Sequence, residues 1–429
     1  MSLQSHGARI RLPPRPSFVR HYCRFLANKR GFGQGMTSGP RSGRTSANPE
    51  GPEPMSPVHY RSEGFPPEGR LDWRRLAPLI GPAAAAVARY DCVLARVPNA
   101  RALLTGLRVR EAVWSSRIEN IHTSVTEVFE MRAGLAPTNP YVRDDTHEVG
   151  CLLAAERQVR KMLDELPLSL RIIREAHALL LAGPRGWSKS PGAFRRAPVW
   201  IGAPGSTPET ATFVPAPANR VPDAMSRWER YIHADARDRL VQIAVQHAEF
   251  EAIHPFLDGN GRMGRMLIPV LMQKYGLIRT PVFGLSARIA ARRSFYHDGL
   301  LGVSRDDDWT GWCLYALDAM RNQAREGAAA IEAILALRTE VEAVLPNRTR
   351  AHQPGPALDR LFAHPVFRVS DFVSVGDIPP RTARRLLWQL RSAEVLEEAA
   401  PASGRRSAVL GFPRLLEILN AGERFRTAR

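Results

Sequence analysis

The residues of this chain that could do chemistry gather in one short segment, residues 254–265. It reads His254-Pro-Phe-Leu-Asp-Gly-Asn-Gly-Arg-Met-Gly-Arg265 and holds a histidine, a carboxylate, three glycines, an asparagine and two arginines. This mixture is not typical of a core helix, because glycine lowers helix stability and burying charged groups costs free energy. The composition therefore predicts a functional loop.

The glycines and arginines of this segment indicate phosphate binding. We expect one helix to end near Ile253 and another to begin near Arg262, with Gly259-Asn-Gly261 as the loop between them. Glycine tolerates positive φ, so successive N–H groups can face inward at a helix N-terminus and form an anion cradle. Arg262 and Arg265 are three residues apart, and both would add charge-assisted contacts to phosphates.

The histidine and the carboxylate add catalytic capacity. Asp258 offers one carboxylate, which is too few for a closed metal site but suits Mg²⁺ shared with substrate phosphates. His254 is placed to act as a general base for a hydroxyl that attacks phosphorus. A histidine before proline can instead cap a helix, but the other residues of the segment favour a catalytic role for His254.

A dinucleotide-binding fingerprint is the alternative for the same glycines. Gly259, Gly261 and Gly264 fit the pattern G-x-G-x-x-G. That fingerprint requires a preceding strand and an acidic residue about 20 positions further on. Residues 240–253 have helical spacing instead, and no acidic residue occurs between Met266 and His297. The segment also lacks the Gly-Lys-Ser/Thr ending of a P-loop.

Apolar periodicity around this segment predicts a mainly α fold. The expected helices cover residues 80–95, 109–120, 147–166, 168–181, 221–233, 239–253, 266–276, 294–301 and 309–344, with a short helix after Asn99. The period is lost at residues 194–202 and 210–214, which predict two short strands around a turn-rich loop. Such a hairpin has exposed edges that invite pairing with another strand.

The chain is long enough for two or three domains. Residues 1–66 are basic and rich in proline and glycine, which predicts disorder. Helical regions are expected at 67–140 and, as the core that carries the functional loop, at 141–345. A polar linker at 346–356 leads to a tail at 357–429.

The tail predicts a small C-terminal winged helix-turn-helix domain. Helical patterns at 358–363 and 369–373 precede a turn, an arginine-faced helix at 381–391 and a strand at 407–411. In such a domain the arginine-bearing helix enters the major groove of DNA. A helical module for dimerisation or protein contact is the alternative, and Trp388 is expected in the domain core.

Charge and cysteine usage limit the partners. The net charge is +18 and the isoelectric point is about 10.7, which favours polyanions such as nucleic acid, nucleotides or acidic proteins. No apolar run approaches the roughly 20 residues of a membrane span. The four cysteines lie far apart, which indicates reduced thiols in a cytoplasmic protein.

Residues 254–265 resemble the signature of the Fic (Fido) family, His-x-Phe-x-Asp/Glu-Gly-Asn-Gly-Arg-x-x-Arg, at every position. The resemblance implies transfer of AMP from ATP-Mg²⁺ to a Ser, Thr or Tyr hydroxyl of a target protein. In that case His254 deprotonates the hydroxyl and Asp258 holds Mg²⁺. The nucleotide-binding set would be Gly259, Asn260, Gly261, Arg262, Met263, Gly264 and Arg265, with Tyr296 near the adenine.

Two further stretches carry the resemblance. Ser115-Ser-Arg-Ile-Glu-Asn120 is similar to the inhibitory helix of the subclass with an N-terminal intramolecular inhibitor. Ser115 and Glu119 share one helix face, and the resemblance implies that Glu119 pairs with Arg265. The stretch Val199, Trp200, Ile201 and Gly202 resembles the family's flap, which would hold the target segment by strand addition.

The expected function is therefore that of a protein adenylyltransferase inhibited by its own Glu119, with ATP and a hydroxyl-bearing protein as partners. Removal of AMP from a modified target is an alternative, because a docked Glu119 could position a water. A DNA-binding regulator whose nucleotide site only senses is another. The sequence leaves a homodimer open.

Overall fold

The computed structural model describes residues 56–61, 63–345, 355–374 and 378–421. The chain divides into two units, Met1–Glu53 and Pro54–Arg429, and all described residues belong to the second. The predictions for residues 1–55 and for most of the linker, residues 346–354, lie outside the described residues.

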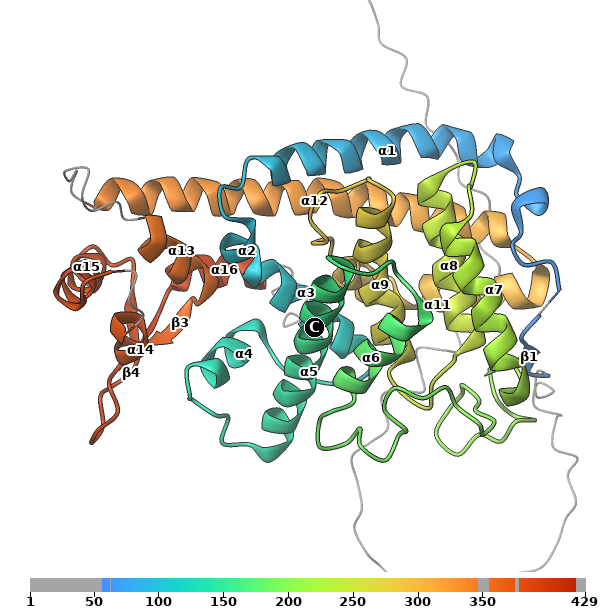
Figure 1. Ribbon diagram of the computed structural model, residues 1–429, viewed down its shortest axis with the longest axis horizontal. Helices are drawn as coiled ribbons and strands as arrows, with labels where there is room; N and C mark the ends of the chain where they lie inside the picture. The colour runs from blue at the N-terminus through green and yellow to red at the C-terminus, as the bar shows by residue number, and fades with distance from the viewer. Residues whose placement is uncertain (1–55, 62, 346–354, 375–377, 422–429) are drawn as a thin grey trace, which may run out of the picture. The chain divides into compact units, whose positions relative to one another are not determined.

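The region before residue 346 is mainly helical, as predicted (Figure 1). Its helices are α1 (Trp73–Ala95), α2 (Ala100–Leu103), α3 (Thr105–Ile118), α4 (Val125–Arg132), α5 (Pro140–Leu163), α6 (Leu170–Leu180), α7 (Val221–His233), α8 (Arg239–Ile253), α9 (Asn260–Lys274), α10 (Ser286–Ala291), α11 (Arg293–Asp306) and α12 (Trp309–Val344). Short 3₁₀ turns occupy Glu68–Arg70 and Ala218–Arg220. The predicted bounds of α7, α8 and α12 are confirmed.

Helix α8 is the centre of the core. Nearly all of its residues are buried, and it packs against α7, α9 and α12. The long helices α1 and α12 run side by side along one edge of the fold (Figure 1). Asp238 caps the start of α8 by accepting a hydrogen bond from the Val241 N–H at 2.9 Å. A helix buried on all sides holds its C-terminal end rigidly, and the functional loop begins at that end.

The start of the described chain corrects the prediction of disorder up to residue 66. Strand β1 (Val58–His59) pairs in parallel with β2 (Phe213–Val214). The Tyr60 hydroxyl donates to Glu249 Oε1 at 2.7 Å, and Phe65 packs edge-on against Tyr231. These few aromatic contacts anchor a segment that is too short for its apolar residues to show any periodicity.

The predicted hairpin at 194–214 exists in reduced form. Ile201 forms one antiparallel bridge with Phe213, with N–H to O distances of 2.8 Å and 3.0 Å in the two directions. Strand β2 is thus paired on both sides, by β1 and by Ile201. Residues 194–200 form no strand, and Pro198 within them has no N–H to donate to a ladder.

The tail consists of α13 (Gly355–Ala363), β3 (Val366–Arg368), α14 (Val369–Ser374), α15 (Pro380–Ser392), β4 (Glu397–Ala400), β5 (Val409–Gly411) and α16 (Pro413–Asn420). Its antiparallel sheet has the order β3-β5-β4. The winged helix-turn-helix assignment stays a prediction. The expected burial of Trp388 is wrong: its side chain is 68% exposed, since the leucines of α15 cover the domain core from the opposite side.

The tail packs on the helices at the start of the core. Helix α16 contacts α3, α4 and α12, and α13 contacts α2 and α3. The buried Leu419 side chain fills the space where a Cβ on Gly106 would lie, so glycine at this position lets α16 approach α3. The tail therefore supports the helix that carries Ser115 and Glu119.

Three of the cysteines, Cys92, Cys151 and Cys313, are free thiols. Among the residues that the structure describes, no helix combines the length and the apolar character needed to cross a bilayer.

Leu419→Ala should lower the free energy of unfolding by about 2–4 kcal/mol, because it leaves a cavity against α3. Urea unfolding followed by circular dichroism measures the loss. Arg414→Ala on the same helix removes only an exposed ion pair with Glu340 and should cost about 0–1 kcal/mol. Equal losses in the two variants would contradict the packing of α16 on α3.

Candidate active site

The loop between α8 and α9 is fixed by backbone geometry and one side chain. His254 ends α8 in the left-handed region (φ 51°), and Gly259 has φ 79° just before α9. The Asn260 side chain accepts from the Phe256 N–H and donates to the Phe256 carbonyl, both at 2.9 Å. Helix α9 begins at Asn260, two residues earlier than predicted, so N–H groups of Gly261 and Arg262 lie in its free first turn.

His254 is a neutral base in this arrangement. Its Nδ1 lies 3.3 Å from the Glu251 carbonyl, so an Nδ1–H donating there leaves Nε2 as the basic nitrogen. Burial lowers the pKa of His254 to about 4; the Glu251 carbonyl opposes this shift and the charge of Arg195 adds to it. The imidazole therefore carries no charge at neutral pH.

Arg195 holds the backbone at His254 in place. Its guanidinium donates to the His254 carbonyl at 2.7 Å and also to the carbonyls of Ala216 and Ile253. It is nearly fully buried, so these carbonyls replace its hydration. Sequence analysis gave Arg195 no such role, because a surface arginine and a buried one look the same in a loop sequence.

His177 supports the loop from α6. Its ring stacks on Phe256 with centroids 3.6 Å apart. The Gly192 N–H donates to Nδ1 at 2.9 Å, so Nε2 carries the hydrogen and donates to the Asp258 carbonyl at 3.0 Å. Burial lowers the pKa of His177 to about 4, which keeps the ring neutral. Nothing in the sequence marks His177 for this role, since one histidine in a helix gives no signal.

Asp258 is the acidic residue of the loop that can reach a metal ion. Its Oδ1 accepts from the Gly259 N–H at 2.5 Å and lies 3.5 Å from Arg262 Nη2, while 46% of the side chain is exposed. In the described part of the chain, no three His, Cys, Asp or Glu side chains cluster as a metal site. One accessible carboxylate fits an ion whose other ligands come from a phosphate substrate.

Arg262 is held by a buried ion pair. Its Nη1 lies 3.0 Å from Glu148 Oε2, and both side chains are only 3% exposed. Glu148 comes from α5 and also lies 3.8 Å from Arg185. The pair fixes the direction of the Arg262 guanidinium across the first turn of α9.

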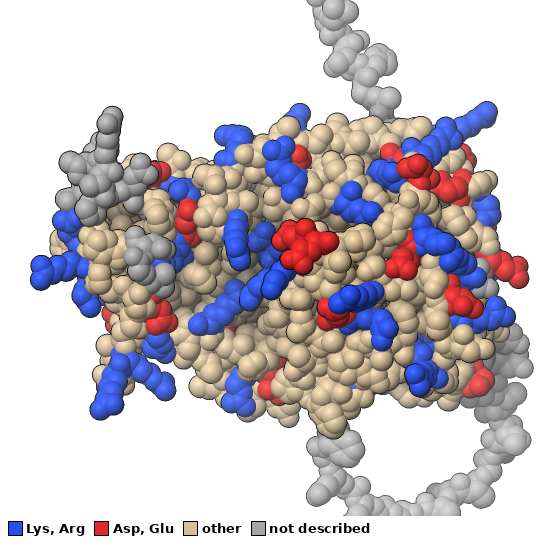
Figure 2. Space-filling model, viewed as in Figure 1, with Lys and Arg blue, Asp and Glu red and all other residues tan. Residues whose placement is uncertain are grey.

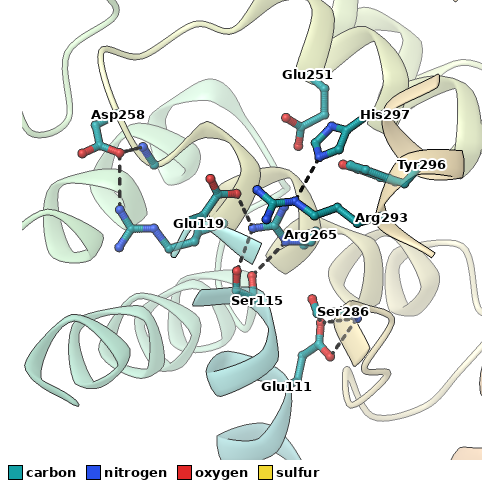
Figure 3. A network of polar contacts seen from close by, with 12 residues as sticks. Glu111, Ser115, Glu119, Glu251, Asp258, Arg265, Ser286, Arg293, Tyr296 and His297 are labelled. Carbon is teal, nitrogen blue, oxygen red and sulfur yellow. Dashed lines mark hydrogen bonds and ion pairs between the residues drawn. The ribbon is translucent and has the colours of Figure 1, made fainter. Parts of the chain in front are cut away.

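Arg265 meets the end of α3 (Figure 3). Its Nη2 donates to Glu119 Oε1 at 2.7 Å and to the Ser115 carbonyl at 2.9 Å, and its Nε donates to Ser115 Oγ at 3.0 Å. The structure thus brings Ser115 and Glu119 to Arg265, which lies about 150 residues further along the chain.

The charges of this contact stabilise each other. Burial alone would raise the pKa of Glu119, but the Arg265 charge and hydrogen bond outweigh it and hold the pKa below its usual value. Burial would lower the pKa of Arg265, and the Glu119 charge raises it instead. A Cβ on Gly261 would collide with Glu119 Oε1, so only glycine there permits the contact.

Tyr296 lies behind Arg265 and not at the open face of the loop. Its ring is 2% exposed, and its hydroxyl is 2.9 Å from His247 Nε2. The buried Glu251 nearby has one carboxylate oxygen without a hydrogen-bond partner, and burial raises its pKa to about 7. This placement gives Tyr296 a packing contact, and the adenine contact expected of it stays a prediction.

The flap residues present an accessible backbone beside the loop. Trp200 and Ile201 are each about two-fifths exposed, Gly202 is exposed and Val199 is half-buried. The Trp200 indole N–H donates to the Ser206 carbonyl at 2.6 Å, which fixes the turn. Of these four residues, Ile201 forms a β-bridge within the described part of the chain, and the role of the stretch as a flap stays a prediction.

The fold is mainly helical, and the loop between α8 and α9 combines a histidine with free N–H groups at a helix N-terminus. The sequence profile of the Fic/DOC family matches residues 167–272, and that of the Fic/DOC family N-terminal region matches residues 77–157. The chain belongs to the Fic/DOC family.

Individual proteins agree with this placement. A protein adenylyltransferase Fic from Drosophila grimshawi is 29% identical over 137 residues, which are 31% of this chain and 26% of that protein. A probable protein adenylyltransferase from Aquifex aeolicus is 29% identical over 96 residues, 22% of this chain and 30% of the relative. The match thus spans only about a quarter to a third of these curated relatives.

A solved structure shows the same fold. The crystal structure of a Fic family protein from Desulfovibrio desulfuricans G20 has a TM-score of 0.51 and 23% identity, covering 79% of this chain and 95% of that one.

Glu148→Ala should lower the free energy of unfolding by up to about 3–5 kcal/mol, because it leaves the buried Arg262 with only the partly exposed Asp258, 3.5 Å away, as a counter-charge. Glu148→Gln keeps an acceptor and should cost less. Urea unfolding measures both, with Glu175→Ala as the control, since that residue forms an exposed pair with Arg171. A loss for Glu148→Ala no larger than for the control would contradict the buried pair.

Proposed function

We propose that the protein transfers AMP from ATP to a hydroxyl side chain of a target protein, and that Glu119 holds this activity off. The observation that carries the proposal is a neutral His254 beside the free first turn of α9, with Arg265 occupied by Glu119. The relatives named as adenylyltransferases support the reaction type.

The chemistry needs a base and a phosphate cradle. The target hydroxyl oxygen attacks the α-phosphorus while His254 Nε2 accepts its proton. A bond forms between that oxygen and phosphorus, the bond from phosphorus to the bridging oxygen breaks, and pyrophosphate leaves. Mg²⁺ held by Asp258 and the substrate phosphates would neutralise charge on those phosphates.

Backbone and arginine donors would bind the leaving phosphates. The N–H groups of Gly261 and Arg262 lie at the N-terminus of α9, where the helix dipole favours an anion. The ion pair with Glu148 orients the Arg262 guanidinium before ATP binds. The N–H groups of Arg262 that do not contact Glu148 are therefore already positioned for a phosphate. Preorganised donors of this kind stabilise charge at the outer phosphates without reorganisation.

Glu119 is proposed as an inhibitor because it uses the donors that Arg265 would offer to ATP. Nε and Nη2 are directed at Ser115 and Glu119. A phosphate at the same place would meet the Glu119 carboxylate, and two anions repel. Productive binding therefore requires Glu119 to leave Arg265.

The docked Glu119 also favours a second candidate, removal of AMP from a modified target. Its side chain is 39% exposed while one oxygen pairs with Arg265, so the carboxylate can contact solvent water. A carboxylate so placed could activate that water for attack on the AMP phosphorus. The flap would hold the target segment by strand addition in either direction of the reaction.

Glu119→Gly should raise incorporation of α-labelled AMP into protein at least about tenfold, because Arg265 becomes free for phosphate. The assay uses ATP and Mg²⁺ and measures protein-bound label. Adding His254→Ala should lower the rate about 10²–10⁴-fold by removing the base.

Asn120→Gly is the matched control, since it places glycine beside Glu119 at a position with φ 61° and keeps the carboxylate. Equal activation by both variants would mean that loosening the helix end, and not the loss of the carboxylate, is responsible. Release of AMP from a labelled target by the wild type, with no labelling by Glu119→Gly, would favour the second candidate.

The pH dependence follows from the lowered pKa of His254. The base form is the active one, and burial lowers the pKa of His254, so the rate of Glu119→Gly should fall only at a pH well below the ordinary histidine value. It should stay flat through about 6.5, the ordinary histidine value. Single-turnover labelling with saturating ATP measures the profile, and a midpoint near 6.5 would show that the imidazole is not kept neutral.

A further inference from the structure

The outer side of α15 is a charged surface that the nucleotide site leaves unexplained. Arg381, Arg384 and Arg385 are exposed, and Trp388 is 68% exposed. Residues at spacings of three and four lie on one side of a helix, so these four side chains form one stripe. The opposite side of the helix faces the tail's core through the buried side chains Ala383, Leu386, Leu387 and Leu390.

The arginines of this stripe have no counter-charge within the described residues. None of the ion pairs or side-chain hydrogen bonds there involves Arg381, Arg384 or Arg385, whereas Arg391 at the end of the helix pairs with Glu398 at 3.2 Å. The positive charge is thus concentrated in the first half of α15. The helix dipole adds to it at that end.

The same end of the molecule shows further positive charge. Figure 2 shows Lys and Arg side chains projecting at the left end of the view, where Figure 1 places α15 and β4. Arg405 and Arg406 are exposed at the tip between β4 and β5, where Ser403 and Arg406 form a bridge. Unpaired arginines on an exposed helix gain most from a partner with regularly spaced negative charges.

An exposed tryptophan within a cationic stripe suits a partner that offers apolar surface as well as negative charge. The major groove of duplex DNA is wide enough for an α-helix, has phosphates along both walls and exposes thymine methyl groups on its floor. Helix α15 has 13 residues, and its stripe covers two turns with all four side chains exposed.

We propose that the outer face of α15, with Arg381, Arg384, Arg385 and Trp388, binds duplex DNA. The arginines contact phosphates and Trp388 contacts base edges in the major groove. This surface lies on the domain that packs against α2 and α3, where Asn99 donates to Asp359 at 2.8 Å. DNA binding does not depend on the AMP-transfer proposal, and its test uses no catalytic readout.

Fluorescence anisotropy of the full chain with a labelled random-sequence duplex tests the surface. The triple variant Arg381→Ala, Arg384→Ala, Arg385→Ala should bind at least about tenfold more weakly. Its slope of log affinity against log salt should shrink by about 0.9 for each phosphate that the variant no longer neutralises. Trp388→Ala should weaken binding with the salt slope unchanged.

The control triple Arg74→Ala, Arg75→Ala, Arg89→Ala removes the same charge from exposed positions of α1 and should bind like the wild type. Thermal unfolding checks that both triples fold. Equal losses of affinity in the two triples would overturn the site in favour of net charge alone. Polyglutamate competing as well as unlabelled duplex, a single strand binding as tightly as the duplex, or no binding by the wild type would also overturn it.

Discussion

The central contact of the structure is the ion pair between the buried guanidinium of Arg265 and the carboxylate of Glu119. The Arg265 residue is 3% exposed, and an unpaired charge at such a position would be costly. In this state Glu119 and Ser115 supply the acceptors from the end of α3. Under the proposed function a nucleotide phosphate supplies them instead, so inhibitor and substrate compete for the same donors.

Around Arg265, the contacts that hold the loop are fixed, whereas the contact with Glu119 can be exchanged for another. Arg262 pairs with Glu148 inside the core, and Arg195 and Asn260 hold the loop by hydrogen bonds to its backbone. These contacts lie within the packed helices around α8 and give the loop one shape. Glu119 is the residue that ends α3, and its side chain is 39% exposed, so it can move without unfolding the core.

Much of this was predictable from sequence where the signal is local. Periodicity sets the bounds of α8 and α12, and a spacing of four places Ser115 and Glu119 on one face. Glu148 could not be assigned, because it lies 114 residues before Arg262 and has the sequence context of any helix acid. Strand β1 has two residues and no periodicity. Trp388 was misplaced because an amphipathic helix shows which residues share a side, but a tryptophan fits either side.

The competition for Arg265 can be measured most directly by calorimetric binding of ATP and of ADP to the wild type and to Glu119→Gly. If Glu119 blocks the place of the outermost phosphate, the variant should bind ATP about tenfold more tightly, about 1.4 kcal/mol, while its affinity for ADP stays unchanged. Equal gains for both nucleotides, or no gain for ATP, would contradict the central claim that Glu119 and that phosphate share Arg265.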